Sequence, residues 1–325
     1  MTGVSVILCT YNRHRSLSNA LNSLALSILP ATIQWEVLVV DNNSKDETRQ
    51  VVERFCQLYP GRFRYLFEPR QGKSYALNSG ICHTHRDILA FVDDDVTVQP
   101  IWLQHLITPL LGSEWAGGGG RILPEPGFSP PPWLALQGPH SQLGALCAYL
   151  DQGDLSGPIH RPPVGTNMAF RREMFEKYGG FREDLGPRPG SELRSEDTEF
   201  GRRLMAGGER LYYAPSAIVF HEINENRIRK KFFLSWWFAF GRGSILEAGR
   251  IPSTIEMVKI VARIILATPK WLLDVDPQHR FYRKCRIWYE AGKVIAVYQL
   301  MVRGNANAAL PQYSSDGGVQ NHRLG

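Results

Sequence analysis

Residues 88–95 read Ile-Leu-Ala-Phe-Val-Asp-Asp-Asp: five apolar residues followed directly by three carboxylates. An unbroken apolar run of this length is typical of a strand that is covered on both faces, as in a parallel sheet. Upstream, residues 4–10 and 36–40 have the same character, and each run leads through a polar turn into a segment with helical spacing. This alternation predicts an α/β fold with a mainly parallel sheet and helices on both faces.

Polar residues stand where the predicted strands end. Asp41 follows the second run, and the first run leads into Thr10-Tyr11-Asn12. Ligands of open parallel sheets bind beyond the carboxyl ends of the strands, so we expect these residues to share one edge with Asp93–Asp95. A carboxylate at Asp41 can accept hydrogen bonds from a base or ribose and Tyr11 can stack on a base, although ordinary turns use the same residue types.

The run Asp93–Asp95 is the strongest functional signal. Adjacent like charges repel, which destabilises the fold unless a cation neutralises them. Such oxygen ligands suit Mg²⁺ or Mn²⁺, and Mg²⁺ is usually held by one or two carboxylates plus substrate phosphates. A helix N-cap accounts for one aspartate but leaves the other two unexplained. The run therefore predicts a divalent-metal site.

Residues 70–78, Arg-Gln-Gly-Lys-Ser-Tyr-Ala-Leu-Asn, indicate an anion site. Arg70 and Lys73 supply positive charge, and the amides of a helix that begins after Gly72 attract anions. The triplet Gly-Lys-Ser also occurs in P-loops, but Phe67 stands where the first glycine of that motif belongs. We therefore exclude a P-loop.

A second acidic position, Glu196-Asp197, opens a predicted helix that runs to about Ala206. One interpretation is electrostatic, because acids at a helix N-terminus complement the helix dipole. The other is catalytic, because a metal site together with a separate proton acceptor fits the activation of a hydroxyl group. His221 follows a short apolar run and is either a structural histidine or a ligand.

The composition is that of an ordinary globular protein of 325 residues, with 43% hydrophobic residues, 21% charged residues and a net charge of +6. The densest basic cluster, at residues 227–231, is too short to predict nucleic-acid binding. Five scattered cysteines without a Cys-x-x-Cys pair indicate neither a zinc site nor a disulfide framework. We find no signal peptide, and charges interrupt the apolar run at residues 255–273, so we expect a cytoplasmic protein that does not cross a membrane.

The second half of the chain gives weaker signals. Short strands are predicted at residues 121–123, 164–170, 211–214 and 218–221. Residues 129–163 look like a long loop. From 226 to 303 the pattern is helical and amphipathic, and these helices either pack on the α/β domain or lie on an anionic membrane. Residues 304–325 are polar and predicted to be disordered.

Together, these motifs resemble the family 2 glycosyltransferases of the GT-A fold. The matching segments, in the order of the family, are residues 4–13 (VSVILCTYNR), 39–46 (VVDNNSKD), 70–80 (RQGKSYALNSG), 88–95 (ILAFVDDD), 165–172 (GTNMAFRR), 179–181 (GGF) and 195–200 (SEDTEF). The resemblance implies a GT-A catalytic domain with a Rossmann-like sheet at residues 1–225, followed by the helical extension at 226–303.

The resemblance also assigns the nucleotide contacts. Thr10, Tyr11, Asn12 and Asp41 look like contacts of the base and ribose, with Asp41 facing a uracil, so a UDP-sugar is the expected donor. By the same resemblance, Arg70 and Lys73 lie near the ribose or phosphates.

The remaining roles concern the metal and the proton. Asp93, Asp94 and Asp95 look like the DxD motif, in which Asp95 binds Mn²⁺ or Mg²⁺ directly and Asp93 touches the ribose or the metal. His221 resembles a late histidine that completes the metal site in some members. Asp197 resembles the general base that deprotonates the acceptor.

The implied reaction is an inverting, single in-line displacement that moves a sugar from a nucleotide diphosphate to a hydroxyl of a lipid-linked or polysaccharide glycan. The Gln-x-x-Arg-Trp pattern of processive members is absent around Trp236-Trp237, so we expect the addition of a single sugar. Two other functions remain open on the residues alone: a sugar nucleotidyltransferase, and a membrane-associated binding protein with a degenerate site.

Overall fold

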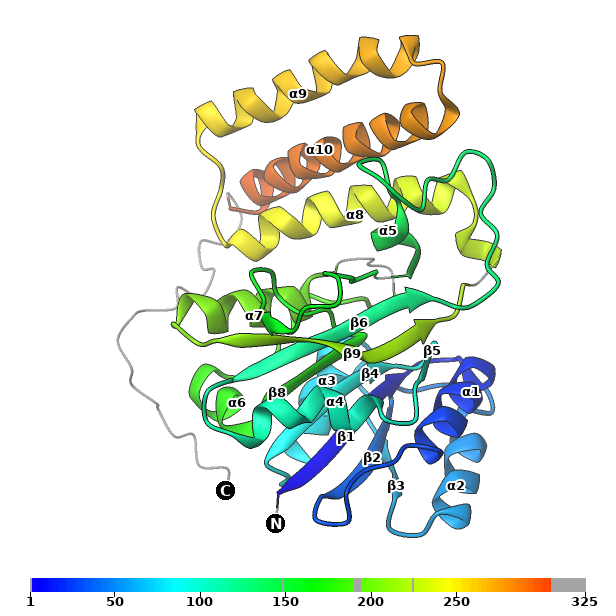
Figure 1. The fold of residues 1–325 in the computed structure, drawn as a ribbon. Coiled ribbons are helices and arrows are strands. Elements are labelled where there is room, and N and C mark those ends of the chain that lie inside the picture. The colour runs from blue at the N-terminus through cyan, green and yellow to red at the C-terminus, as the bar shows by residue number, and fades with distance from the viewer. Residues whose placement is uncertain (1, 148, 190–193, 224, 305–325) are drawn as a thin grey trace.

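The computed structural model describes residues 2–147, 149–189, 194–223 and 225–304. Its nine-stranded sheet has the order β3-β2-β1-β4-β8-β6-β9-β5, with β7 paired to β9 (Figure 1). The strands are β1 (Gly3–Thr10), β2 (Gln34–Asp41), β3 (Phe63–Phe67), β4 (Ile88–Asp93), β5 (Val96–Val98), β6 (Gly117–Pro124), β7 (Gly157–Pro158), β8 (Asn167–Arg171) and β9 (Leu211–His221). The tail predicted to be disordered lies, beyond Gly304, outside the described residues.

The helices alternate with the strands in the first half of the chain and follow them in the second. They are α1 (His14–Ala25), α2 (Thr48–Leu58), α3 (Lys73–Cys82), α4 (Trp102–Ile107), α5 (Leu143–Cys147), α6 (Arg172–Tyr178), α7 (Glu196–Ala206), α8 (Lys230–Ala248), α9 (Thr254–Leu273) and α10 (Pro277–Gly304). Two 3₁₀ helices, η1 (Thr108–Leu111) and η2 (Glu225–Arg227), complete the set in the described part of the chain.

The first half of the sheet is parallel, as predicted. β1 pairs in parallel with both β2 and β4, and β2 pairs in parallel with β3. In this register Thr10 lies opposite Asp41, and Cys9 lies opposite Asp93. The polar residues that end these strands therefore meet at one edge of the sheet.

The second half of the sheet is mixed. β8 runs antiparallel to β4 and β6, β6 runs parallel to β9, and β9 runs antiparallel to β5 and β7. The predicted strands at 211–214 and 218–221 are one strand, β9, whose pairing with β6 shifts between Gly120 and Arg121. The loop predicted at 129–163 contains the short elements α5 and β7.

The glycine run at 117–120 belongs to β6, whereas the sequence placed the strand only at 121–123. A β-carbon on Gly118 would overlap the carbonyl oxygen of Tyr212, and one on Gly117 would overlap the ring of Phe170. These neighbours come so close that only glycine fits there. A run without side chains carries no apolar signal, which is why the strand was predicted too short.

Each face of the sheet carries its own core. On one face, Leu17 and Leu21 of α1, Phe55 of α2 and Trp102 of α4 are buried against β1, β2 and β4. On the other face, α3, α6 and α7 contribute a cluster that includes Phe200, whose ring packs edge-on against Phe170 of β8. Helices on both faces are as predicted.

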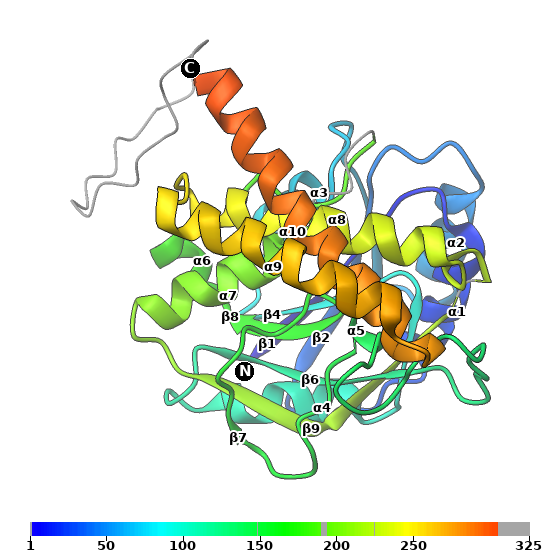
Figure 2. The same ribbon diagram turned by 90° about the horizontal axis from the view of Figure 1, so that it is seen from above.

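Helices α8, α10 and α9 form successive layers beyond the carboxylate edge of the sheet (Figures 1 and 2). A β-carbon on Gly241 of α8 would overlap the carbonyl of Tyr289 in α10, and one on Gly292 of α10 would overlap the carbonyl of Phe238. The two backbones are therefore in direct contact at these glycines. Among the helices of the described residues, none combines the length and apolar character needed to span a bilayer.

Candidate active site

A cleft of about 1390 Å³ opens at the carboxyl ends of β1 and β4. Its wall combines residues of these strand ends with residues of α3, α7 and α8. Most of the site residues predicted from sequence line it, namely Thr10, Tyr11, Lys73, Asp93, Asp94, Asp95, Asp197 and His221. Asn12, Asp41 and Arg70 are not among the lining residues. The topology of the sheet thus brings residues of β1 and α7, which lie far apart in sequence, to one cavity.

Asp93 is fixed by two side chains from different elements. Lys73, at the start of α3, donates from Nζ to Asp93 Oδ1 over 2.6 Å, and Thr166 donates from Oγ1 to Asp93 Oδ2 over 2.7 Å. Burial favours the neutral carboxyl, but the charge of Lys73 outweighs it and lowers the pKa of Asp93. Asp93 therefore stays ionised with both oxygens already engaged.

Asp94 lies between the first turn and its two acidic neighbours. Thr10 donates from Oγ1 to Asp94 Oδ2 over 2.7 Å, and Arg13 donates to Asp94 Oδ1 over 3.0 Å. Burial, together with the charges of Asp95 and Asp93, raises the pKa of Asp94 to about 6 despite the opposing charge of Arg13.

Asp95 faces the histidine. Its Oδ1 lies 3.4 Å from His221 Nε2, while Oδ2 accepts from Arg13 over 2.7 Å and from Arg227 over 2.9 Å. Burial favours the neutral carboxyl, but His221 and the two guanidiniums outweigh it and lower the pKa of Asp95. His221 Nδ1 lies 2.8 Å from the carbonyl oxygen of Glu222, which can only accept, so Nε2 is the nitrogen left for a ligand.

Asp197 is half-buried on the first turn of α7 and is oriented by backbone amides. Gly165 donates from N to Asp197 Oδ2 over 2.6 Å, and Thr198 donates from N to Asp197 Oδ1 over 2.7 Å. Ser195, which precedes the helix, has φ of 90°, a left-handed conformation that is strained for serine. The strain lies directly before the acidic pair.

Lys73 connects the two acidic groups of the cleft. Its Nζ lies 2.6 Å from Asp93 Oδ1 and 3.7 Å from Glu196 Oε1. Burial disfavours a charged lysine, but Asp93, Glu196 and Asp197 outweigh it and raise the pKa of Lys73. Burial and the charge of Asp197 raise the pKa of Glu196 to about 7.

The predicted residues outside the cleft wall have local partners. Asp41 is buried and accepts hydrogen bonds from Ser44 N over 2.9 Å and from the hydroxyl of Tyr65 over 2.9 Å. Asn12 accepts from Lys45 N over 2.7 Å and stabilises the adjoining turn. Arg70 is paired with Glu68 and lies over the ring of Tyr75.

Several lining residues were missed by the sequence analysis. Arg13 and Arg227 meet at Asp95 although they are far apart in the chain, and Thr166 reaches Asp93 from the start of β8. The nearest signal for Arg13 was its place after Thr10-Tyr11-Asn12. Phe232, Trp236 and Phe240, spaced by four on α8, also line the cleft, whereas the sequence left open whether this helical region packs on the α/β domain or lies on a membrane.

The donor set suits a divalent cation. Asp95 and His221 provide an oxygen and an imidazole nitrogen that face each other, which are ligands that Mn²⁺ accepts. No three His, Cys, Asp or Glu side chains of the described residues converge on one point. Two protein ligands are nevertheless enough for an ion that takes its other ligands from substrate phosphates and water.

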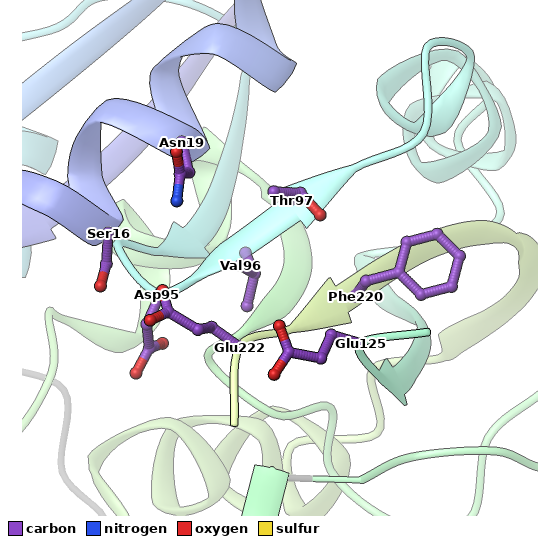
Figure 3. Close-up of a pocket in the computed structure, with 8 residues that line it drawn as sticks. All are labelled: Ser16, Asn19, Asp95, Val96, Thr97, Glu125, Phe220 and Glu222. Atoms are coloured by element: carbon purple, nitrogen blue, oxygen red, sulfur yellow. The ribbon is translucent and has the colours of Figure 1, made fainter. Parts of the chain in front are cut away.

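A separate small cavity of about 70 Å³ lies beside Asp95 (Figure 3). It is lined by Ser16, Asn19, Asp95, Val96, Thr97, Glu125, Phe220 and Glu222. Two hydrogen bonds lie beside it: the Glu125 carboxylate accepts at Oε1 from Ile223 N over 3.0 Å, and the backbone amide of Glu222 donates to the carbonyl of Asp95 over 2.8 Å. These bonds hold the end of β9, and with it His221, against Asp95.

Comparisons with known proteins identify the family of the chain. Residues 5–179 match "Glycosyl transferase family 2", and residues 155–237 match "Glycosyl transferase family group 2". Glycosyltransferase AglE of Haloferax volcanii is 32% identical over 271 residues, which cover 83% of this chain and 80% of that protein. Succinoglycan biosynthesis protein ExoM of Rhizobium meliloti is 28% identical over 225 residues, covering 69% and 68%.

Solved structures share the fold. The mannosyltransferase PcManGT from Pyrobaculum calidifontis, in complex with GDP-Man and Mn²⁺, has a TM-score of 0.54 at 17% identity and covers 95% of this chain and 76% of that one. GalNAc-T7, with UDP, GalNAc and Mn²⁺, has a TM-score of 0.52 at 17% identity, covering 68% and 43%. The chain therefore belongs to glycosyltransferase family 2 and is a glycosyltransferase with the GT-A fold.

Proposed function

We propose that this glycosyltransferase transfers a sugar from a nucleotide diphosphate donor to a hydroxyl of a glycan acceptor, with inversion at the anomeric carbon. The observation that carries the proposal is that Asp95 with His221, and Asp197 with Lys73, line one cleft. The first pair would hold a divalent cation, which would supply positive charge for a diphosphate, and Asp197 suits the removal of a proton. The GDP-Man bound to one fold neighbour, and the UDP and GalNAc bound to another, support the donor class.

Asp95 and His221 would hold the divalent cation, and Mn²⁺ in both neighbours supports this choice of ion. When bound, the ion neutralises charge that develops on the leaving diphosphate. Arg13 and Arg227 already lie at Asp95 and are placed to add positive charge beside the same phosphates. Lys73 and Thr166 hold Asp93 ionised for a polar contact with the donor.

Asp197 is the proposed general base. The acceptor hydroxyl gives its proton to an Asp197 carboxylate oxygen while its own oxygen attacks the anomeric carbon, and the bond from that carbon to the diphosphate oxygen breaks. The amides of Gly165 and Thr198 fix the carboxylate, so little reorganisation precedes proton transfer. Asp197 is half-buried on the first turn of α7, where the positive end of the helix dipole faces a negative charge.

The acceptor is proposed to be a lipid-linked or polysaccharide glycan that lies against α8. Phe232, Trp236 and Phe240 offer an aromatic row in the same cleft as Asp197, and aromatic side chains combine apolar area with little loss of freedom. The names of two relatives, the succinoglycan biosynthesis protein and a glucosyl-dolichyl phosphate glucuronosyltransferase of Haloferax volcanii, support glycans of these classes.

A donor screen tests the proposal. UDP-sugars and GDP-sugars are added to the full chain with and without Mn²⁺, and the unfolding temperature is measured, because a ligand that binds only the native state raises it. We expect a rise that needs Mn²⁺, and the preferred base decides whether the prediction of UDP holds. With an acceptor, the released product should be a nucleoside diphosphate, whereas pyrophosphate would indicate a nucleotidyltransferase.

The matched variants are Asp95→Asn and Asp154→Asn. Asp95→Asn should abolish the Mn²⁺-dependent rise, while Asp154→Asn, at an exposed carboxylate paired with Arg121, should keep it. If Asp95→Asn responds to donor and Mn²⁺ as the wild type does, the assignment of the metal site is wrong.

A further inference from the structure

Helix α9 is the outermost layer of the molecule (Figures 1 and 2). Of its twenty residues, Ile260 is the one classed as buried. Its inner side packs on α10, where Arg263 pairs with Glu290 over 3.2 Å and Met257 joins a cluster with Val297. The inner side of α9 is therefore held by α10, and its opposite side has no covering element in the described part of the chain.

The outer side of α9 is apolar. Six of its large apolar side chains are more than half exposed: Ile255, Val258, Ile265, Leu266, Leu272 and Leu273. Val258, Ile265 and Leu272 are seven residues apart, which places them on one face of the helix. A contiguous exposed apolar surface of this kind marks an interaction site.

Beyond the first turn of α9, where Glu256 is paired with Arg250, only positive charge borders this surface. From Met257 to Leu273 the helix has no Asp or Glu, and it carries Lys259, Arg263 and Lys270. Lys259 and Lys270 are exposed, and their spacing of eleven residues places both on the same side, next to the apolar row. Apolar side chains with lysines at the border are the pattern of a helix that lies in a lipid interface.

We propose that the α9 face, meaning the six exposed apolar residues together with Lys259 and Lys270, docks on the surface of an anionic phospholipid bilayer. The apolar side chains enter the boundary between headgroups and acyl chains, and the lysines bind anionic headgroups. A second copy of this chain is the competing occupant. A twofold contact would bring like charges together at both borders, so the charge pattern favours lipid.

The α9 face lies within the helical region 226–303, for which the sequence left open packing on the α/β domain or contact with an anionic membrane. Helix α8 belongs to the same region, but Phe233 is buried against α10 and Trp236 lines the cleft. The proposal concerns where the enzyme lies and does not depend on the reaction it carries out.

Sedimentation of the full chain with vesicles tests the proposal. Vesicles of phosphatidylcholine that contain phosphatidylglycerol should carry the protein down, and vesicles of phosphatidylcholine alone should carry much less. Lys259→Gln with Lys270→Gln should weaken binding to the anionic vesicles by roughly twenty- to thirtyfold, since each lysine near such a surface contributes about a fivefold factor. Val258→Ser with Ile265→Ser should remove most of the remaining binding.

Matched controls lie elsewhere on the surface. Leu155→Ser changes a side chain that is 87% exposed before β7, and Arg54→Gln removes a positive charge from α2, at the opposite end of the molecule from α9 (Figure 1). Both controls should bind vesicles as the wild type does. All variants should keep the donor-dependent rise in unfolding temperature, which separates a failure of docking from a failure of the proposed reaction.

Three results would overturn the proposal: no difference between the two kinds of vesicle, unchanged binding by the lysine variant, or equal losses in the controls. A dimer in light scattering that Val258→Ser with Ile265→Ser dissociates, without vesicle binding by the wild type, would assign the α9 face to self-association instead.

Discussion

Buried carboxylates lie at both ends of the parallel strands, and their pKa values are shifted in opposite directions. At the amino end, Glu36 accepts from Ser5 Oγ over 2.8 Å, from Thr84 Oγ1 over 3.1 Å and from Arg64 over 3.1 Å. Burial raises its pKa, but these donors outweigh it and lower the pKa below the ordinary value of 4.5. At the carboxyl end, the pKa of Asp94 is instead raised to about 6.

The difference lies in what each acid has as a partner. The charge of Glu36 is matched by donors that belong to the fold, so it stabilises the native state. The acids of the cleft crowd one another, and the fold alone does not relieve their repulsion. Functional sites often reduce stability in this way. Substitutions at the two ends should therefore separate stability from activity.

The largest expected effect is the loss of turnover in Asp197→Asn. An amide cannot accept the acceptor proton, so kcat should fall by about 10²- to 10⁴-fold. Donor binding should stay close to wild type, because Asn keeps the size of the side chain. The unfolding temperature should fall modestly, because the amide nitrogen of Asn cannot accept the hydrogen bond from Gly165 N or Thr198 N. Single-turnover kinetics with saturating donor and acceptor measures this. Glu199→Gln, two residues along the same helix and paired with Arg203, is the control and should retain turnover. Turnover near wild type in Asp197→Asn would remove it as the base.

The next effect is on stability. Glu36→Gln should lower the free energy of unfolding by about 1 to 3 kcal/mol, because Arg64 loses its charged partner and a buried oxygen becomes a donor. Urea denaturation measures the change, and the donor-dependent rise in unfolding temperature should be unaffected.

The same variant has a pH signature. A lowered pKa means that the stabilisation by Glu36 is present above about pH 4.5 and is lost as the pH falls below that value. The difference between wild type and Glu36→Gln should therefore shrink in acid. A difference that stays constant down to low pH would show that shape, and not charge, is what matters at this end.

Asp94→Asn should have a smaller effect of the opposite sign. The pKa of Asp94 rises from 3.8 to about 6 on folding, so the native state holds its proton more tightly and stability falls as the pH rises through that window. Removing the charge should stabilise the metal-free protein above pH 6 by about 1 kcal/mol, after the weaker bond to Arg13 is allowed for. Denaturation in the presence of a chelator at pH 4 and pH 7 measures this. A loss of stability at pH 7 would show that the charge of Asp94 does not destabilise the native state.

How much of the fold and of the site can be predicted from the sequence depends on the signal that each residue carries. The apolar runs of β1, β2 and β4 fix the parallel core, and the carboxylates of Asp93–Asp95 at a strand end predict the site. The mixed second half was not predicted, because Gly117–Gly120 and the three residues of β5 lack an apolar pattern long enough to recognise. Arg13 and Arg227 were missed as partners of Asp95 because long-range ion pairs depend on the folded topology.

The smallest expected effect tests how finely Asp197 is positioned. A β-carbon on Gly165 would lie 3.1 Å from Asp197 Oδ2 and 3.4 Å from its Cβ, closer than side chains normally pack. Gly165 has no positive φ, so alanine brings no backbone strain and acts only by pushing the carboxylate. A shift of a few tenths of an ångström should lower kcat by roughly two- to tenfold, because displacements near 1 Å cost about 10²-fold. The KM for the donor should not change.

Gly112→Ala is the matched control for that shift, since its β-carbon would meet no atom within 4 Å. It should leave kcat at the wild-type value. If Gly165→Ala also leaves kcat unchanged, the reaction tolerates movement of Asp197, and the proton must pass to a group that Gly165 does not touch. Glu196 would then be the acid to test, because it is buried beside Lys73 with a pKa raised to about 7.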